Sequence, residues 1–382
     1  MEIIGRARAL LQGAQESKAL ELLAPEIAKH PENVPLLLAF GEALLEANDV
    51  ETAYGVLQKA CELDADAAQG VEKFFYLGQI CGGADGCALM NVAITRLDHQ
   101  LKCVHEGRTD DEAVKELAGT YGTQEALAAY LISKINQGIF AEIEIWMTDL
   151  CMEPEAEQQC DQLISHSLML DAENPEAFSL LALIRISQQR LAEAEEALAK
   201  SWLLFAQKKE HLENLQIDGE DESLQYIELV QPLLQLARFA VELAQYDLAP
   251  QIAGAVSEIN DNCLDSFYIE ALALTFKAKL LYSRQVAHDD DYSEMDYREM
   301  EVASLLSSSD EAIQTCVADA KLALMQAYRV LNSHDGEAQD PDLVQQVKEM
   351  LAAFGGAVMV ELMPERGDDN IDWEAELGEG QG

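Results

Sequence analysis

Apolar residues recur along most of this chain at helical spacing, and small residues stand among them at fixed distances. Gly41, Ala53, Leu57 and Ala60 are separated by twelve, four and three residues in a segment of helix-forming residues. This spacing is typical of helix-turn-helix repeats about 34 residues long, in which small residues let the two helices approach closely. Because one such amphipathic pair buries its apolar face only against neighbouring pairs, the pattern predicts a stacked, all-α chain.

The same frame repeats about seven times and predicts a right-handed superhelical solenoid of tetratricopeptide repeats over residues 1–356. The marker residues of the successive repeats are Ala7, Ala19 and Leu23; Gly41, Ala53 and Leu57; Gly78, Ala93 and Leu97; Thr148, Cys160 and Ile164; Ala182, Ala194 and Leu198; Ala237, Ala249 and Val256; and Ala273.

Several of the repeats are irregular. We expect a lengthened turn over residues 82–86 in the third repeat and an irregular helix over 119–138, and the fourth repeat, over 142–172, matches the frame least well. An acidic insertion at 288–301 interrupts the seventh repeat, which resumes as a helix over 310–332. A helix over 341–354 is predicted to cap the stack. The Gly- and acid-rich segment 357–382 is predicted to be a disordered tail.

The chain is strongly acidic: 25 Lys and Arg face 70 Asp and Glu, a formal net charge of −45. Residues 361–382 carry eight acids and one base, and residues 288–301 carry seven acids and one base. Without both segments the net charge is still −32, so the repeats themselves are acidic. Direct binding to nucleic-acid phosphates is therefore not expected, and the charge favours basic partners instead.

Motifs for catalysis, metal binding or cofactor binding were not found. The eight cysteines form no CxxC pair, and the seven histidines form neither HExxH nor a close Cys/His cluster in the sequence. An Asp-rich run at 289–291 lacks the glycine and glutamate of a calcium loop, and Gly82-Gly83 lacks the Lys of a phosphate-binding loop. We predict a non-enzyme with no cofactor and no metal. No run of about 18 apolar residues is present, so no membrane contact is expected.

In repeats of this type the first helix lines the concave face, and the frame assigns mostly acidic residues to that groove. The predicted partner-binding residues are Glu42, Glu46, Glu72, Phe75, Glu142, Asp149, Glu153, Glu176, Glu242 and Glu270. One alternative is that these are ordinary solvated helix faces of an acidic protein. The absence of the Lys and Asn residues that would capture a C-terminal carboxylate favours a groove for a basic, extended polypeptide.

Three segments carry a resemblance to a known family. The stretch from Glu144 to Glu157, the segment Tyr76-Leu77-Gly78-Gln79 before a Gly-Gly turn, and the acidic tail with Asp372-Trp373-Glu374 are similar to the fungal assembly chaperones dedicated to ribosomal protein L4 of the large subunit. The resemblance implies a tetratricopeptide solenoid that captures newly made L4 through its basic internal loop, shields it and escorts it to nuclear pre-ribosomes. It implies a location in cytoplasm and nucleus.

Two other functions are compatible with the sequence. One is a tetratricopeptide-repeat scaffold or adaptor within another protein complex, with the acidity serving solubility. The other is an acidic mimic of nucleic acid that blocks many basic proteins. The number of distinct partners distinguishes them, because a dedicated chaperone is expected to bind one client.

Overall fold

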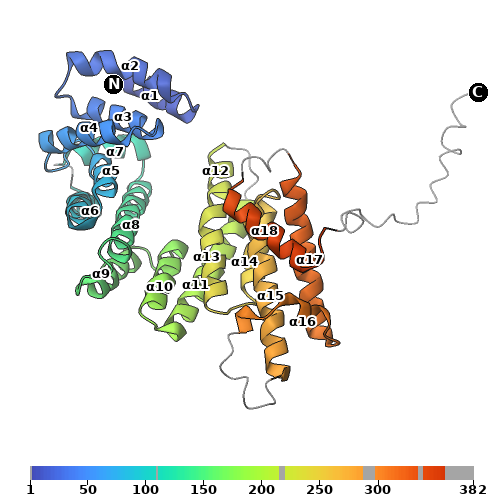
Figure 1. Ribbon diagram of the computed structural model, residues 1–382. Coiled ribbons are helices and arrows are strands. Elements are labelled where there is room, and N and C mark those ends of the chain that lie inside the picture. Colours follow the sequence, from blue (N-terminus) through green and yellow to red (C-terminus); the bar gives the residue numbers. More distant parts are fainter. Residues whose placement is uncertain (1, 109–110, 215–219, 287–296, 334–338, 358–382) are drawn as a thin grey trace, which may run out of the picture. The chain divides into compact units, whose positions relative to one another are not determined.

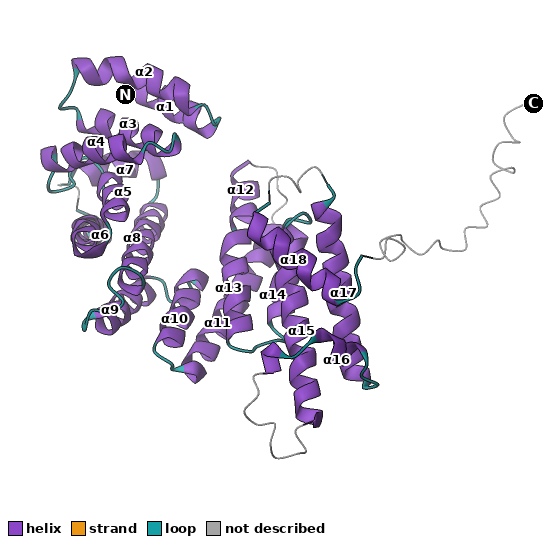
Figure 2. Ribbon diagram, viewed as in Figure 1, coloured by secondary structure: helices purple, strands orange, loops and turns teal. Residues whose placement is uncertain are grey.

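The computed structural model describes residues 2–108, 111–214, 220–286, 297–333 and 339–357. Within these ranges the regular elements are helices and no strand is present (Figure 2), so the all-α prediction is confirmed. None of the described helices has the length and hydropathy needed to cross a bilayer. The predicted tail after residue 357 and residues 288–296 of the acidic insertion lie outside the described residues.

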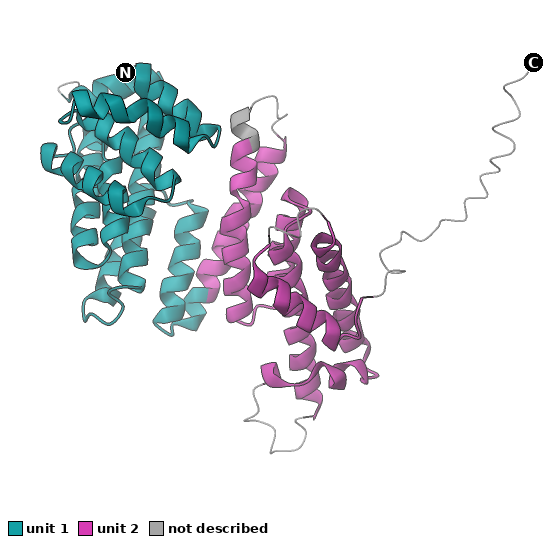
Figure 3. Cartoon of the chain, turned by 45° about the horizontal axis from the view of Figure 1, so that its top comes forward, with its two compact units in different colours: residues 1–194 teal, residues 195–382 magenta. Residues whose placement is uncertain are grey.

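The chain divides into two compact units, residues 1–194 and 195–382 (Figure 3). The helices of unit 1 are α1 (Glu2–Gln12), α2 (Glu16–Lys29), α3 (Val34–Glu46), α4 (Val50–Leu63), α5 (Glu72–Cys81), α6 (Gly83–His105), α7 (Glu112–Tyr121), α8 (Gln124–Met147), α9 (Ala156–Leu170) and α10 (Pro175–Ser187). Helix α11 (Leu191–Asn214) begins in unit 1 and continues in unit 2.

The remaining elements belong to unit 2. They are α12 (Glu220–Glu228), α13 (Val230–Glu242), α14 (Ala249–Ile259), α15 (Leu264–Val286), the 3₁₀ turn η1 (Tyr297–Glu299), α16 (Val302–Leu306), α17 (Glu311–Leu331) and α18 (Pro341–Ala353).

Consecutive helices pack against each other within each unit, as the repeat frame predicts. In unit 1, α1 packs on α2, α3 on α4 and α5 on α6, and α2 and α4 also contact the helix that follows them. In unit 2, α13 packs on α14 and α14 on α15, and α15 lies along α17 (Figure 1). The single solenoid over residues 1–356 stays a prediction.

Local sequence signals set where several helices begin. Asn33 accepts a hydrogen bond from the backbone N–H of Leu36 at the start of α3, and Asp49 accepts one from Thr52 at the start of α4. Asn174 and Asp340 cap α10 and α18, each of which has proline in its first turn. These side chains satisfy N–H groups that have no partner inside the helix. The short connections between the helices thus follow from residues that are readable in the sequence.

Glycines at the helix crossings explain how closely the helices pack. A Cβ atom on Gly41 would lie 2.6 Å from Cδ2 of Leu57, the facing residue of the same repeat. A Cβ on Gly86 of α6 would lie 2.6 Å from the carbonyl oxygen of Gly78 in α5. The first contact involves a side chain that can move, whereas the second involves backbone. The α5–α6 crossing therefore requires glycine at position 86.

The predicted lengthened turn over residues 82–86 is wrong. Helix α5 ends at Cys81 and α6 already begins at Gly83, so the turn consists of Gly82 with a φ of 62°. Positive φ is accessible to glycine without strain, and the Asp149 carboxylate accepts the Gly83 N–H (N to Oδ2, 2.9 Å). A distant capping residue, absent from the local pattern, allows the helix to start this early.

Residues 119–138 also differ from the irregular helix that we expected. They include the end of α7 and the first part of α8, separated by a short turn in which Gly122 has a φ of 70°. Thr123 caps α8 by accepting a hydrogen bond from the Ala126 N–H. The predicted fourth repeat is displaced accordingly, since its first helix is the end of α8 and its second is α9.

A buried ion pair fixes the connection between α4 and α5. Lys73 is fully buried, and its Nζ lies 2.7 Å from Oδ2 of Asp64. Asp64 also accepts hydrogen bonds from the backbone N–H groups of Ala68 and Gln69. Burial opposes the ionisation of Asp64, but Lys73 and these donors outweigh it and hold the pKa of Asp64 below its usual value.

A second buried acid lies between α6 and α8 and is less well compensated. Glu142 is 2 % exposed, and its Oε1 accepts a hydrogen bond from Asn91 Nδ2 at 2.8 Å. Its Oε2 lies near the Trp146 indole nitrogen, but the two atoms do not form a hydrogen bond of good geometry. Burial raises the pKa of Glu142, and the Asn91 amide opposes this only in part.

The α5–α6 crossing gives a stability prediction. Gly86→Ala should lower the free energy of unfolding by about 1–3 kcal/mol, because the added methyl group meets a backbone carbonyl that cannot rotate away. Gly55→Ala in α4 is the control, because nothing lies within 4 Å of its Cβ position. There alanine should stabilise the helix by about 0.5–1 kcal/mol. Urea unfolding followed by circular dichroism measures both, and equal effects would contradict the crossing argument.

The state of Glu142 gives a prediction on pH dependence. Folding raises the pKa of Glu142 above its usual value of about 4.5. Below pH 4.5 the carboxyl group is protonated in both the folded and the unfolded state and costs no stability. As the pH rises through the folded-state pKa, ionisation of the buried group destabilises the fold. Glu142→Gln should therefore increase stability at pH 7 by about 1 kcal/mol, on the scale of one uncompensated buried acceptor.

The parent protein and Glu142→Gln should have nearly the same free energy of unfolding near pH 4. Glu144→Gln, at an exposed acid on the same helix, is the matched control. Urea midpoints measured between pH 4 and 8 decide the point. A difference between Glu142→Gln and the parent that does not change with pH would exclude this explanation.

Candidate functional site

Half-buried acids and tyrosines gather on one surface of unit 1, contributed by the first helices of successive repeats and by α8. We call it the acidic patch. It consists of Arg8 of α1, Glu42 and Glu46 of α3, Glu72 and Tyr76 of α5, and Tyr130 and Lys134 of α8. Stacking of α1, α3 and α5 brings residues that are about 30 residues apart in the sequence within electrostatic reach of each other.

Glu42 is the best-defined member of the acidic patch. Its carboxylate lies 3.3 Å from Nε of Arg8, and its side chain is 15 % exposed. Burial raises the pKa of Glu42 and the neighbouring Glu72 raises it further, while Arg8 acts in the opposite direction. Arg8 and the more distant Lys134 therefore do not fully offset the burial of Glu42, and an additional cation at this place would stabilise its ionised form.

Tyrosine rings line the same patch. Burial and the carboxylates of Glu42 and Glu72 raise the pKa of Tyr76 to about 12, and burial and Glu72 raise that of Tyr130 to about 12. Tyr130 stacks on Tyr121 with ring centroids 4.5 Å apart, and Lys134 Nζ lies 6.0 Å from the Tyr130 centroid. Carboxylates beside aromatic faces suit the guanidinium and ammonium groups of a basic polypeptide.

Two residues that we predicted to bind a partner are buried in unit 1. Phe75 is 7 % exposed and its ring packs against Gly138 of α8, while Glu142 is 2 % exposed. The expectation that these two side chains line an open groove is wrong. The repeat frame places both on the inner helix face, but α8 packs over Phe75, and Glu142, which lies on α8 itself, is buried against Asn91 of α6.

The other predicted residues of unit 1 are exposed but do not all have the same role. Asp149 caps α6 through Gly83, so it serves the fold. Glu153 lies exposed between α8 and α9, and Glu176 is exposed in the first turn of α10. Together with the acidic patch they make unit 1 rich in accessible carboxylates, and partner binding by these residues stays a prediction.

In unit 2 the two predicted residues lie in different surroundings. Glu242 lines a pocket of about 510 Å³ between α13, α15 and α18, together with Tyr268 and the ion pair of Arg238 with Asp265. Glu270 is half-buried, and burial together with the neighbouring Asp319 of α17 raises its pKa. Two cations of unit 2 are paired with neighbouring acids, Arg238 with Asp265 and Lys277 with Asp247.

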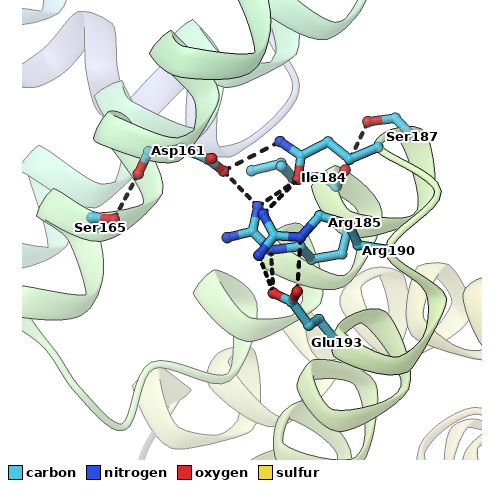
Figure 4. A network of polar contacts seen from close by, with 8 residues as sticks. Asp161, Ser165, Ile184, Arg185, Ser187, Arg190 and Glu193 are labelled. Atoms are coloured by element: carbon cyan, nitrogen blue, oxygen red, sulfur yellow. Dashed lines mark hydrogen bonds and ion pairs between the residues drawn. The ribbon is translucent and has the colours of Figure 1, made fainter.

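Another group of acids in unit 1 shares two arginines within the chain. Arg185 of α10 lies between Asp161 of α9 and Glu193 at the start of α11 and contacts both (Figure 4). Arg190 also pairs with Glu193. These contacts join α9, α10 and the start of α11, so the carboxylates of Asp161 and Glu193 already have cationic partners within the chain.

Sequence reasoning missed two groupings of side chains. The tyrosines and cations of the acidic patch were not assigned, although Tyr76 follows Glu72 by one helical turn. The second grouping joins His99, Cys103 and Asp111, whose ligand atoms lie within 4.8 Å of one another. Their signal was the spacing of four between His99 and Cys103 on one helix.

The sequence of this chain is similar to those of one group of fungal proteins. Residues 262–372 match the family model described as the ACL4 C-terminal domain. A Schizosaccharomyces pombe protein named probable assembly chaperone of rpl4 is 26% identical over 286 residues, which is 74% of this chain and 75% of the relative. An Emericella nidulans protein of the same name is 27% identical over 216 residues, 53% of this chain and 49% of the relative.

A solved structure titled assembly chaperone of RpL4 (Acl4), residues 1–338, matches with a TM-score of 0.60 and 24% identity. The match covers 75% of this chain and 98% of that structure, and it shows a shared fold. The comparisons therefore confirm the resemblance inferred from the sequence, and this chain has homologues among the fungal proteins named assembly chaperone of rpl4.

Proposed function

We propose that this chain is a dedicated chaperone of ribosomal protein L4 and that it binds a basic segment of L4 on the acidic patch of unit 1. Two relatives bear the name of such a chaperone, and a solved structure of that name shares the fold. The observation in this chain that carries the proposal is the largely buried carboxylate of Glu42, 15 % exposed, with Glu72 and Tyr76 within electrostatic reach. A patch of this kind suits a basic polypeptide.

The physical argument rests on what a cation gains at this surface. Glu42 is already largely withdrawn from water, so its carboxylate loses little further hydration when a Lys or Arg of the client binds. The attraction between the two charges is also screened less there than at an open surface. The tyrosine faces add contact area that favours guanidinium groups. The client's positive charge is at the same time withheld from nucleic acid, which is the protection that a newly made ribosomal protein requires.

The whole chain supports the same function at longer range. A net charge of −45 accelerates the encounter with a basic client, and this acceleration decreases as salt is added. We further propose that binding occurs in the cytoplasm through the internal loop of L4 and that the complex carries the client to pre-ribosomes in the nucleus. The longest run of basic residues in the chain is Lys208-Lys209, so nuclear entry would depend on the client.

Charge reversal tests the proposed surface. Glu42→Lys with Glu72→Lys should weaken binding to purified L4 by at least about tenfold, or about 1.4 kcal/mol, because two acidic contacts become repulsive. Calorimetric titration at low and at physiological salt measures the loss, and the affinity of the parent protein should fall with salt.

The matched control reverses Glu51 and Glu62, two exposed acids on α4, and so changes the net charge equally. If both double variants lose affinity to the same extent, the effect comes from net charge and the proposed surface is wrong. Affinity purification of the parent from fungal extract tests the function itself. Recovery of a stable multi-protein assembly without L4 would favour the scaffold alternative.

A further inference from the structure

The clustered donors His99, Cys103 and Asp111 lie in unit 1, on α6 and at the start of α7. His99 and Cys103 are one helical turn apart on α6 and so share a face. Asp111, the N-cap of α7, faces them. The His99 Nδ1 atom lies 3.8 Å from Cys103 Sγ and 3.6 Å from Asp111 Oδ2.

These separations are close to those of a metal coordination shell. Metal–ligand distances of about 2.0–2.3 Å in a tetrahedral zinc site place neighbouring donors roughly 3.3–3.6 Å apart. The separation of 3.6 Å between His99 and Asp111 lies at the upper edge of this range, and that of 3.8 Å between His99 and Cys103 lies just above it. All three ligand atoms lie within 4.8 Å of one another, so a small inward movement closes them on one ion. We propose that His99, Cys103 and Asp111 form a binding site for one Zn²⁺-type transition-metal ion.

The surroundings hold two of the donors in place. Asp111 accepts the backbone N–H groups of Ala113 and Val114 on Oδ1, which leaves Oδ2 on the side of His99. Cys103 is fully buried on the helix. The His99 side chain is 51 % exposed and lines a pocket of about 580 Å³ with Asn91 and Thr95, which provides an entry path for an ion.

Two guanidinium groups compete with the ion and set the character of the site. Arg96 Nη1 lies 2.8 Å from Asp111 Oδ2, and Arg108 Nη2 lies 3.1 Å from Cys103 Sγ. Metal binding replaces these two contacts, while Arg96 Nη2 keeps its contact of 3.0 Å with Asp111 Oδ1. The site is therefore exchangeable, and weaker than a four-thiolate structural zinc site.

The donor set selects the class of metal. Thiolate and imidazole favour Zn²⁺ or Co²⁺, whereas Mg²⁺ and Ca²⁺ prefer sites made entirely of oxygen. The Cys103 thiol releases its proton to solvent as the metal–sulfur bond forms, and the fourth position is completed by water. This site is separate from the acidic patch, and its existence does not depend on client binding.

Cobalt titration of the full chain tests the proposal. The chain is treated with chelator, dialysed, and titrated with Co²⁺ under a phosphine reductant that keeps the thiols reduced. One equivalent of Co²⁺ should produce thiolate-to-cobalt absorption in the near ultraviolet and tetrahedral bands in the visible, and Zn²⁺ should abolish both. Mg²⁺ at the same concentration should leave the spectrum unchanged.

Single substitutions identify the ligands. His99→Ala, Cys103→Ser and Asp111→Asn should each weaken Co²⁺ binding by at least about tenfold, and Cys103→Ser should also remove the sulfur band. Cys81→Ser, at an exposed cysteine next to α6, is the control and should bind like the parent. Because His99 is exposed, His99→Ala is expected to fold even where Cys103→Ser does not.

Two results would overturn the proposal. One is the absence of a stoichiometric cobalt spectrum in the parent protein. The other is an unchanged spectrum and affinity in His99→Ala, which would place the metal at other residues. The affinity for L4, measured with and without Zn²⁺, tests the proposed chaperone function separately. Failure of the metal proposal therefore does not count against that function.

Discussion

The close approach of neighbouring helices in unit 1 is the constraint on which the rest of that unit depends. Gly41 admits Leu57, Gly86 admits the backbone of Gly78, and a Cβ on Gly138 would lie 2.6 Å from the ring of Phe75. At these crossings a side chain larger than hydrogen separates the helices or forces a neighbour to move. The last crossing sets α8 against α5, which brings Tyr130 near Glu72 and Lys134 within electrostatic reach of Glu42. The acidic patch is thus a product of helix packing at glycines some distance away.

Helix packing decides which of the many carboxylates in this chain differ from ordinary exposed acids. With 70 acids and 25 cations, most carboxylates have no cation to pair with, and an exposed carboxylate in water needs none. Some acids are used internally, as Asp64 with Lys73 and Asp161 with Arg185. Glu42 differs because stacking withdraws it from water more than Arg8 and Lys134 offset, with a second carboxylate, that of Glu72, close by. The proposed binding surface is distinguished by incomplete compensation of a buried charge, not by the number of acids.

Side chains that were expected to face a partner can instead serve the fold. Asp149 was assigned to the groove by its position in the repeat, yet it caps α6 and allows that helix to begin directly after Gly82. Glu142 was assigned in the same way, yet it is buried against Asn91 between α6 and α8. The assignment of Glu142 to an open groove failed because the fourth repeat is displaced: α8 spans 24 residues and replaces the short helix that the frame assumes.

The sequence by itself determined the helical class, the starts of helices such as α3, α4 and α10, and the regular repeats that contain Gly41 and Ala53. These depend on caps, small residues and apolar periodicity, which act over one or two helical turns and are therefore readable locally. The sequence also established the acidity and pointed to the homologues. Tertiary structure alone decided that Phe75 and Glu142 are covered, that Tyr76 and Tyr130 share a surface with Glu42, and that Asp111 meets His99 and Cys103. Each of these depends on contacts between residues far apart in the chain, or on where a neighbouring helix begins and ends. The local pattern does not fix those boundaries, and moving one of them by a helical turn changes the direction of the side chains that follow.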